Sequence, residues 1–239
     1  MFQGDSILTW LQECADNNQP VRLINTYRGI PVAYSARAKV VGDGNAVFYV
    51  NEYQAVCLAL DGKTHLQHPE FPEILRARVV SVDVPSKEVT LTEFAKAGTS
   101  GSRLYTRVQP KEPIEAEIRI RDHAFPGQLA DISLNGVGVI TIGTYTYGDL
   151  DARKGSKVQL FFTLPPTHTL IQLMGQITSV GVSESSKQHR LGCKTFPDDK
   201  TDLLLLDYVA LRRDELMREL SMVYTAMCNA AMRREQLNG

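Results

Sequence analysis

Apolar and polar residues alternate over several short stretches of the chain, and this pattern predicts a mainly β protein. In the stretch 114–121, IEAEIRIR, isoleucine and alanine side chains alternate with glutamates and arginines. A strand places successive side chains on opposite faces, so such a stretch buries one face and exposes the other. Short runs of this kind recur between turn signals rich in glycine, asparagine and proline, which favours small β domains.

The region from Pro20 to about Phe94 predicts a first set of strands. Its β-prone runs are 21–27, 31–41, 46–50, 55–60, 76–84 and 88–94, with turn signals between them. The segment from His65 to Glu73 contains two prolines, which would break a helix that aligned its histidines and glutamates. We therefore expect a polar loop there and no metal site. The first domain is expected to be all-β and to cover residues 1–95.

A second set of strands follows a flexible connection. Residues 96–102, KAGTSGS, contain two glycines and two serines and predict a linker. Six β-prone runs come after it, at 114–121, 125–134, 137–142, 157–164, 170–182 and 188–196. Six strands are enough to close a small barrel. We expect this barrel to occupy residues 103–200.

Helices are expected at both ends of the chain. Residues 5–16 place apolar side chains on one helical face, with Trp10 as an anchor of the N-terminal core. Residues 201–236 contain no proline or glycine and predict one long helix within a C-terminal segment 201–239. Its first half is expected to pack on the barrel, and its second half either packs within the chain or pairs with another copy. The charged residues along it, such as Arg212 and Arg213 with Asp214 and Glu215, predict a solvated face.

Composition narrows the class of protein. Of 239 residues, 43% are hydrophobic and 22% are charged, and the formal net charge is −1. These values are typical of a globular protein, and they argue against a long nucleic acid as main partner, which would require a broad basic surface. The four cysteines form no C-x-x-C pair, and we expect reduced thiols in a cytoplasmic protein. No secretory signal and no membrane-spanning stretch is expected.

A polar cluster stands out between Arg103 and Ile142. Arg103 and Arg107 are four residues apart, and DISLNG follows a strand with Asp131, Ser133 and Gly136 at fixed offsets. Arginine offers a planar fork of donors for phosphate oxygens or the O6/N7 edge of guanine, and aspartate accepts from guanine N–H groups. Glycine permits close approach of a ligand, and the Asn135-Gly136 pair suits a turn with positive φ. This set favours a small anionic purine nucleotide.

The cluster resembles the signature of the PilZ family, R-x-x-x-R followed by D/N-x-S-x-x-G. Arg103, Arg107, Asp131, Ser133 and Gly136 match that signature position by position, and the resemblance covers roughly residues 103–210. It implies a six-stranded barrel that binds the bacterial second messenger cyclic di-GMP on its outside. The expected ligand-binding residues are therefore these five, with Ser102 and Asn135 as further contacts.

The resemblance also carries expectations for the whole chain. An all-β domain in front of the signature resembles the split-barrel-like regulatory domain of two-domain receptors of the flagellar-brake type. Because Arg103 directly follows the linker, ligand binding is expected to order the hinge and change the domain arrangement. Motility, biofilm formation, secretion and transcription are served by similar proteins, so a protein partner is expected. The family often has another arginine where Ser102 stands, which leaves one or two ligand molecules per site open.

Other functional classes fit less well. We expect no enzyme, no catalytic residue, no cofactor and no metal, because the chain contains no nucleophile elbow and no P-loop. His123, His168 and His189 are isolated along the chain and are expected at the surface or in turns. A single-stranded nucleic-acid binder would need a basic groove with aromatic platforms. The alternative function is a scaffold that acts through protein contacts and oligomerises through its long helix.

Overall fold

A computed structural model describes residues 4–69, 71–97, 106–143, 145, 152–182 and 188–238. The chain divides into two compact units. The first contains residues 1–102 and 216–239, and the second contains residues 103–215. Of the helices in the described residues, none is long and apolar enough to cross a membrane.

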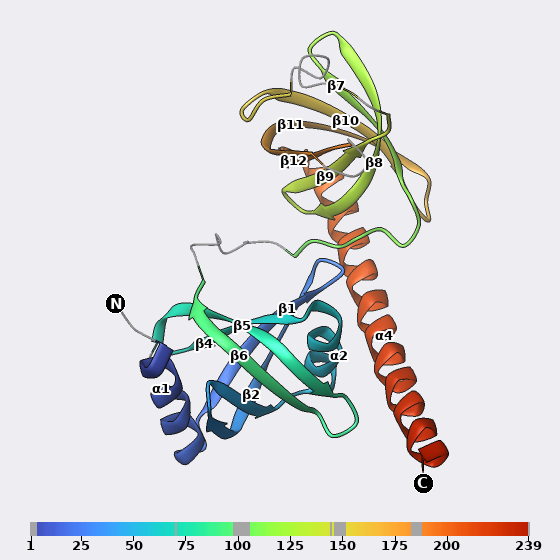
Figure 1. Ribbon diagram of the computed structural model, residues 1–239. Helices are drawn as coiled ribbons and strands as arrows, with labels where there is room; N and C mark the ends of the chain where they lie inside the picture. Colours follow the sequence, from blue (N-terminus) through green and yellow to red (C-terminus); the bar gives the residue numbers. More distant parts are fainter. Residues whose placement is uncertain are drawn as a thin grey trace. The chain divides into compact units, whose positions relative to one another are not determined.

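The first unit is a closed barrel of antiparallel strands (Figure 1). In the described residues its strands are β1 (Pro20–Tyr27), β2 (Ile30–Gly42), β3 (Asn45–Tyr49), β4 (Lys63–His68), β5 (Phe71–Asp83) and β6 (Glu88–Lys96). Their order around the barrel is β1-β2-β3-β6-β5-β4, and β4 closes it by pairing with β1. The alternation of buried and exposed positions along β1 confirms the predicted strand pattern.

Helix α1 (Gly4–Asp16) confirms the predicted N-terminal helix. It buries Ile7, Leu11 and Cys14. The Trp10 ring packs edge-on against His68, with ring centroids 5.4 Å apart. His68 is thus a packing partner in the core of the first unit.

Residues 55–60 form a helix, so the prediction of a strand there is wrong. Helix α2 (Glu52–Asp61) begins after Asn51, whose side-chain oxygen accepts from the Tyr53 N–H at 2.9 Å. It ends at Gly62, which has a φ of 65° and donates its N–H to the Leu58 carbonyl. These are the capping geometries of an α-helix. The run from Gln54 to Leu58 is buried on every side, and a helix without a polar face has the same continuous apolar sequence as a buried strand.

The segment from His65 to Glu73 is also more regular than the expected polar loop. Strand β4 extends to His68, and β5 starts at Phe71. His65 pairs with Arg76 across these strands. Pro69 lies in the short turn between them, where its missing N–H removes no ladder hydrogen bond.

The second unit is a closed barrel too, which confirms the expected pair of β-barrels. In the described residues its strands are β7 (Glu115–Ile120), β8 (His123–Ser133), β9 (Gly136–Thr141), β10 (Lys157–Leu164), β11 (Thr169–Val182) and β12 (His189–Thr195). Their order is β10-β11-β12-β9-β8-β7, with β7 pairing back to β10. His189 is 2% exposed, so it is not a surface histidine. Its Nε2 lies 2.6 Å from the Tyr145 carbonyl oxygen.

Helix α4 (Asp199–Asn238) confirms the long C-terminal helix. In the second unit, Leu204 and Tyr208 line a hollow together with Leu164 at the end of β10. Arg212 is 2% exposed, so the predicted solvated face is wrong at this residue. In the first unit, Leu216 and Leu220 are fully buried. Part of the second half of the helix therefore packs within its own chain.

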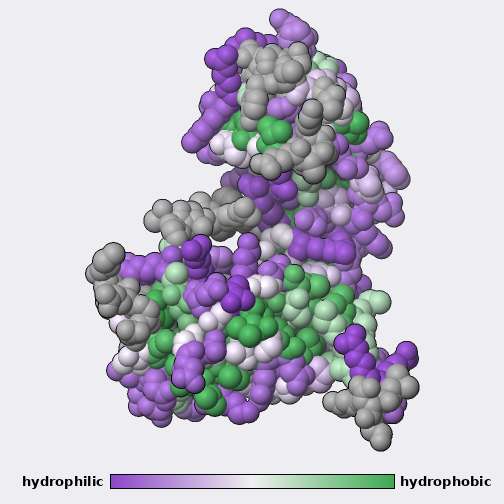
Figure 2. Space-filling view, viewed as in Figure 1, coloured by the Kyte–Doolittle hydropathy of each residue, from purple (hydrophilic) through white to green (hydrophobic). Residues whose placement is uncertain are grey.

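The surface of the first unit mixes apolar and polar side chains on the face shown in Figure 2. The exposed large apolar side chains that the structure describes in its strands and in α2 are Val40, Tyr49, Leu60, Ile74 and Val80. They are distributed over four elements, namely β2, β3, α2 and β5. Single exposed apolar residues are normal on folded proteins, and we assign them no role.

Candidate functional site

A β-bulge in β8 turns Asp131 out of the barrel. Leu129 and Ile132 both lie in the core, with 4% and 0% exposure, although strict alternation would not bury residues three apart. The pairing with β9 shifts between Leu129 and Asp131, so Ala130 is the additional residue. A bulge of this kind reverses which side chains face outward. Asp131 and Ser133 consequently share the outer face.

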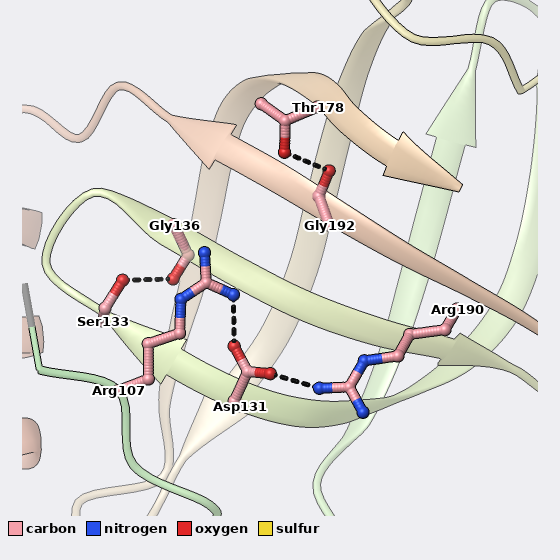
Figure 3. Close-up of polar contacts among 7 residues, drawn as sticks. All are labelled: Arg107, Asp131, Ser133, Gly136, Thr178, Arg190 and Gly192. Carbon is pink, nitrogen blue, oxygen red and sulfur yellow. Dashed lines mark hydrogen bonds and ion pairs between the residues drawn. The ribbon is translucent and has the colours of Figure 1, made fainter. Parts of the chain in front are cut away.

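Asp131 is clamped between two arginines (Figure 3). Arg107 Nη1 donates to its Oδ1 at 2.9 Å, and Arg190 Nη2 donates to its Oδ2 at 2.6 Å. The Asp131 side chain is 8% exposed, whereas those of Arg107 and Arg190 are 27% and 58% exposed. Two charge-assisted hydrogen bonds thus fix both carboxylate oxygens at the edge of solvent.

The segment that carries Arg107 is fixed on both sides. Val108 and Ile132 exchange backbone hydrogen bonds of 2.8 and 2.9 Å, which attaches the segment to β8. Arg212 of α4 donates from Nε to the Gln109 carbonyl oxygen at 2.9 Å. The predicted binding residues Ser102 and Arg103 precede this segment and lie outside the described residues.

Ser133 and Gly136 sit at the two ends of the β8–β9 turn. Ser133 Oγ donates to the Gly136 carbonyl oxygen at 2.9 Å. Asn135 accepts from the Thr195 N–H through its carbonyl oxygen at 3.1 Å. The predicted turn is present, but neither Asn135 nor Gly136 has a positive φ. Gly136 is required for a different reason, because a Cβ there would lie 2.9 Å from the Cys193 carbonyl oxygen.

Glycines form the floor between the polar side chains. Gly138 pairs with Asp131 on one side and with Gly192 on the other. A Cβ at Gly138 would lie 2.6 Å from Asp131 Oδ2, and one at Gly192 would overlap Ser179 Oγ. Thr178 of β11, the strand next to β12, donates from Oγ1 to the Gly192 carbonyl oxygen at 2.9 Å (Figure 3). Glycine at these two positions therefore makes room for the neighbouring side chains, Asp131 over Gly138 and Ser179 over Gly192.

The electrostatics of the outer face over β8, β9 and β12 favour an anion. Arg107, Arg190 and Lys194 supply three positive charges, and Lys194 pairs with Gly136 on the neighbouring strand. Asp131 is the carboxylate that the arginines hold. Burial raises the pKa of the Cys193 thiol to about 12, so this cysteine stays protonated and is no nucleophile. Among the described residues no cluster of metal-ligating side chains occurs.

Sequence reasoning missed Arg190 and Gly192. Their distance along the chain hid them, because Arg190 is 59 residues from Asp131. The order β8-β9-β12 brings them together. A signal was present in the R-x-G spacing of β12, where an outward arginine and an outward glycine alternate with buried residues.

Residues 102–211 match the model of the PilZ domain. The barrel of β7 to β12, the outward Asp131 and Ser133, and the first part of α4 all fall inside the matched region. The chain therefore carries a PilZ domain.

Solved structures similar to this chain include three proteins of low sequence identity. The inhibitor of motility MotI/DgrA from Bacillus subtilis is 13% identical, with a TM-score of 0.44 and coverage of 82% of this chain and 96% of that chain. YcgR from Escherichia coli, in complex with c-di-GMP, is 12% identical, with a TM-score of 0.44 and coverage of 92% and 95%. The MrkH–c-di-GMP complex of K. pneumonia is 11% identical, with a TM-score of 0.44 and coverage of 91% and 96%. No curated protein sequence matches the chain.

Proposed function

We propose that this protein is a receptor for cyclic di-GMP that binds the ligand on the outer face of its second barrel. The observation that carries the proposal is the Asp131 carboxylate, held by Arg107 and Arg190 beside a floor of glycines, in a region that matches the PilZ domain. No chemical step is part of the proposal. The protein acts as a sensor of the dinucleotide.

The chemistry of the side chains matches the ligand group by group. A guanine presents its N1–H and N2–H donors on one edge, and a carboxylate can accept both. The guanidinium of Arg107, together with that of Arg103, suits the phosphates and the O6/N7 edge of the base. Gly136 and Gly138 let the base and ribose approach the strands closely. Each charge-assisted contact is worth about 1.5–3 kcal/mol, so two or three of them are sufficient for micromolar affinity.

The proposal extends to the linker. Arg103 follows residues 96–102 directly, and Arg107 follows four residues later. A ligand bound by both arginines would order this connection and so change the arrangement of the two units. This step rests on the sequence, and the protein partner that would respond to it stays a prediction.

Calorimetric titration of cyclic di-GMP into the full-length protein tests the receptor function. We expect micromolar or tighter binding that is lost in Arg103→Ala and in Asp131→Ala, and the stoichiometry will distinguish one ligand molecule from two. Arg119→Ala is a matched control, because Arg119 lies on β7 of the same barrel, is half exposed and pairs with a carboxylate of its own, Glu117. The absence of binding to folded wild-type protein would reject the receptor and favour the scaffold.

A further inference from the structure

The two oxygens of Asp131 are bound by arginines of different character. Arg107 belongs to the R-x-x-x-R pair and is the less exposed of the two. Arg190 comes from β12, outside both halves of the signature, and more than half of its side chain is exposed. Its contact is the shorter one, at 2.6 Å against 2.9 Å for Arg107. The two arginines therefore need not have the same role once a ligand is present.

Ligand binding creates an electrostatic problem at Asp131. The proposed ligand carries two phosphate charges, and it competes with Asp131 for the guanidinium of Arg107. If Arg107 turns to the ligand, a carboxylate that is only 8% exposed faces a dianion without its first partner. A charge so removed from water needs a compensating cation. Arg190 can fill that role without leaving Asp131, because it already binds the opposite oxygen.

The backbone keeps the contact between Arg190 and Asp131 open. The oxygen bound by Arg190 is Oδ2, and it is the atom nearest to the position that a Cβ on Gly138 would occupy, at 2.6 Å. Gly192, which pairs with Gly138, likewise places no side chain between β12 and β8. The guanidinium of Arg190 lies beside the Asp131 carboxylate in Figure 3. Glycine at position 138 thus leaves room for the Asp131 carboxylate in the place where Arg190 reaches it.

From this geometry we propose that Arg190 is a positioning residue that orients the Asp131 carboxylate toward the guanine edge and thereby determines selectivity for guanine over adenine dinucleotides. The inference rests on the proposed function. A carboxylate binds guanine well only when both of its oxygens lie in the plane of the base, where they can accept hydrogen bonds from N1–H and N2–H. Adenine has an acceptor nitrogen at N1, so the same carboxylate repels it. Arg190 acts through Asp131 and does not itself bind the ligand.

The test compares Arg190→Ala and Arg190→Lys with Arg119→Ala in titrations with cyclic di-GMP and cyclic di-AMP. We expect Arg190→Ala to weaken cyclic di-GMP binding about tenfold, as for the loss of one charge-assisted hydrogen bond. Binding of cyclic di-AMP, weak or undetectable in the wild type, should not weaken further, so the selectivity falls. Arg190→Lys keeps the positive charge but lacks the planar guanidinium, so it should retain part of the selectivity that Arg190→Ala loses. Arg119→Ala should match the wild type, and equal unfolding midpoints would show that all the variants are folded.

A second measurement separates positioning from direct contact. In an Asp131→Asn background, Arg190→Ala should cause no further loss, because the charge through which Arg190 acts is gone. A loss that persists there would show that Arg190 touches the ligand and would overturn the positioning role. If Asp131→Asn binds too weakly to measure, the recovery of selectivity by Arg190→Lys decides the question. Wild-type selectivity in Arg190→Ala overturns this inference alone, whereas a wild-type protein that binds no dinucleotide overturns the receptor function as well.

Discussion

Gly138 faces Asp131 across the β8–β9 pair, and its missing side chain determines what the carboxylate can contact. The nearest atoms to a Cβ at this position would all belong to Asp131, at 2.6, 2.9 and 3.0 Å. Asp131 cannot swing away freely, since Arg107 and Arg190 hold both of its oxygens. A single methyl group at Gly138 should therefore act directly on the carboxylate that we propose binds the ligand.

Gly138→Ala is expected to displace Asp131 and weaken cyclic di-GMP binding by about tenfold or more, since each 1.4 kcal/mol is a factor of ten in affinity. Overpacking a closed position of this kind also lowers the free energy of unfolding by about 1–3 kcal/mol. Titration and thermal unfolding measure the two effects separately.

Gly181→Ala is the matched control for this substitution. Gly181 lies in β11 of the same barrel, and a Cβ there would meet its nearest atom, the Arg190 carbonyl oxygen, only at 4.0 Å. It should bind and unfold as the wild type does. Wild-type affinity in Gly138→Ala would show that Asp131 tolerates displacement and that its present position is not the binding position.

The sequence could identify part of this site and not the rest, for a physical reason. Asp131, Ser133 and Gly136 lie within one hairpin, so their spacing alone predicts that they lie together. Arg190 and Gly192 join them through the pairing of β12 with β9, which depends on how the whole barrel closes. Local patterns predict hairpins, whereas contacts between distant strands require the strand order.

At the level of elements, alternation predicted strands well and failed where burial is complete. Strands β7, β10 and β12 each have one face in the core, so buried and more exposed residues alternate along them. Helix α2 is buried from Gln54 to Leu58 and therefore shows no period. Gln54 is buried although it is polar, because its side chain donates a hydrogen bond of 2.5 Å to Asn25 Oδ1. No local sequence pattern indicates this contact. The residues that cap helix α2, Asn51 and Gly62, were the local sequence signal that could have predicted a helix.

The short segment that carries Arg107 depends on a third element, helix α4. Arg212 binds the Gln109 carbonyl oxygen through Nε and Glu215 through Nη1, at 2.9 and 2.8 Å. Gln109 follows Val108, which pairs with Ile132 of β8, the strand that carries Asp131 and Ser133. The position of Arg107 is thus fixed by contacts of a buried arginine on the helix as well as by the barrel.

Arg212→Met is expected to loosen this segment, because methionine keeps much of the apolar volume but leaves the Gln109 carbonyl oxygen unpaired. The loss of a buried charge-assisted hydrogen bond costs about 1–3 kcal/mol. Hydrogen exchange at the Val108 and Ile132 amides should accelerate, and cyclic di-GMP binding should weaken moderately. Arg213→Met, at the exposed neighbouring position, is the control and should leave both measurements unchanged. Equal exchange in both variants would show that β8 alone holds the segment.

At the scale of the molecule, each barrel is closed by its own strands. β4 returns to β1 in the first unit, and β10 returns to β7 in the second. A closed barrel exposes no unpaired edge, so neither barrel needs strands of the other. Two runs of short strands, separated by a segment rich in glycine and serine, predicted two β domains, but β4, which closes the first barrel, extends into the stretch that was expected to be a polar loop. In our proposal, the binding of cyclic di-GMP is what would change the arrangement of the two barrels.

Small-angle scattering of the full-length protein tests that link. If cyclic di-GMP orders the connection through Arg103 and Arg107, the scattering profile at saturating ligand should differ from that of the free protein. Arg119→Ala should reproduce the wild-type change, and Asp131→Ala, which is not expected to bind, should show none.

Insertion of a second Gly-Ser-rich stretch between Lys96 and Ser102 should leave the affinity nearly unchanged but reduce the change in profile, because a longer flexible connection transmits less restraint. An unchanged profile in wild-type protein that binds the ligand would contradict the hinge and leave the receptor function intact.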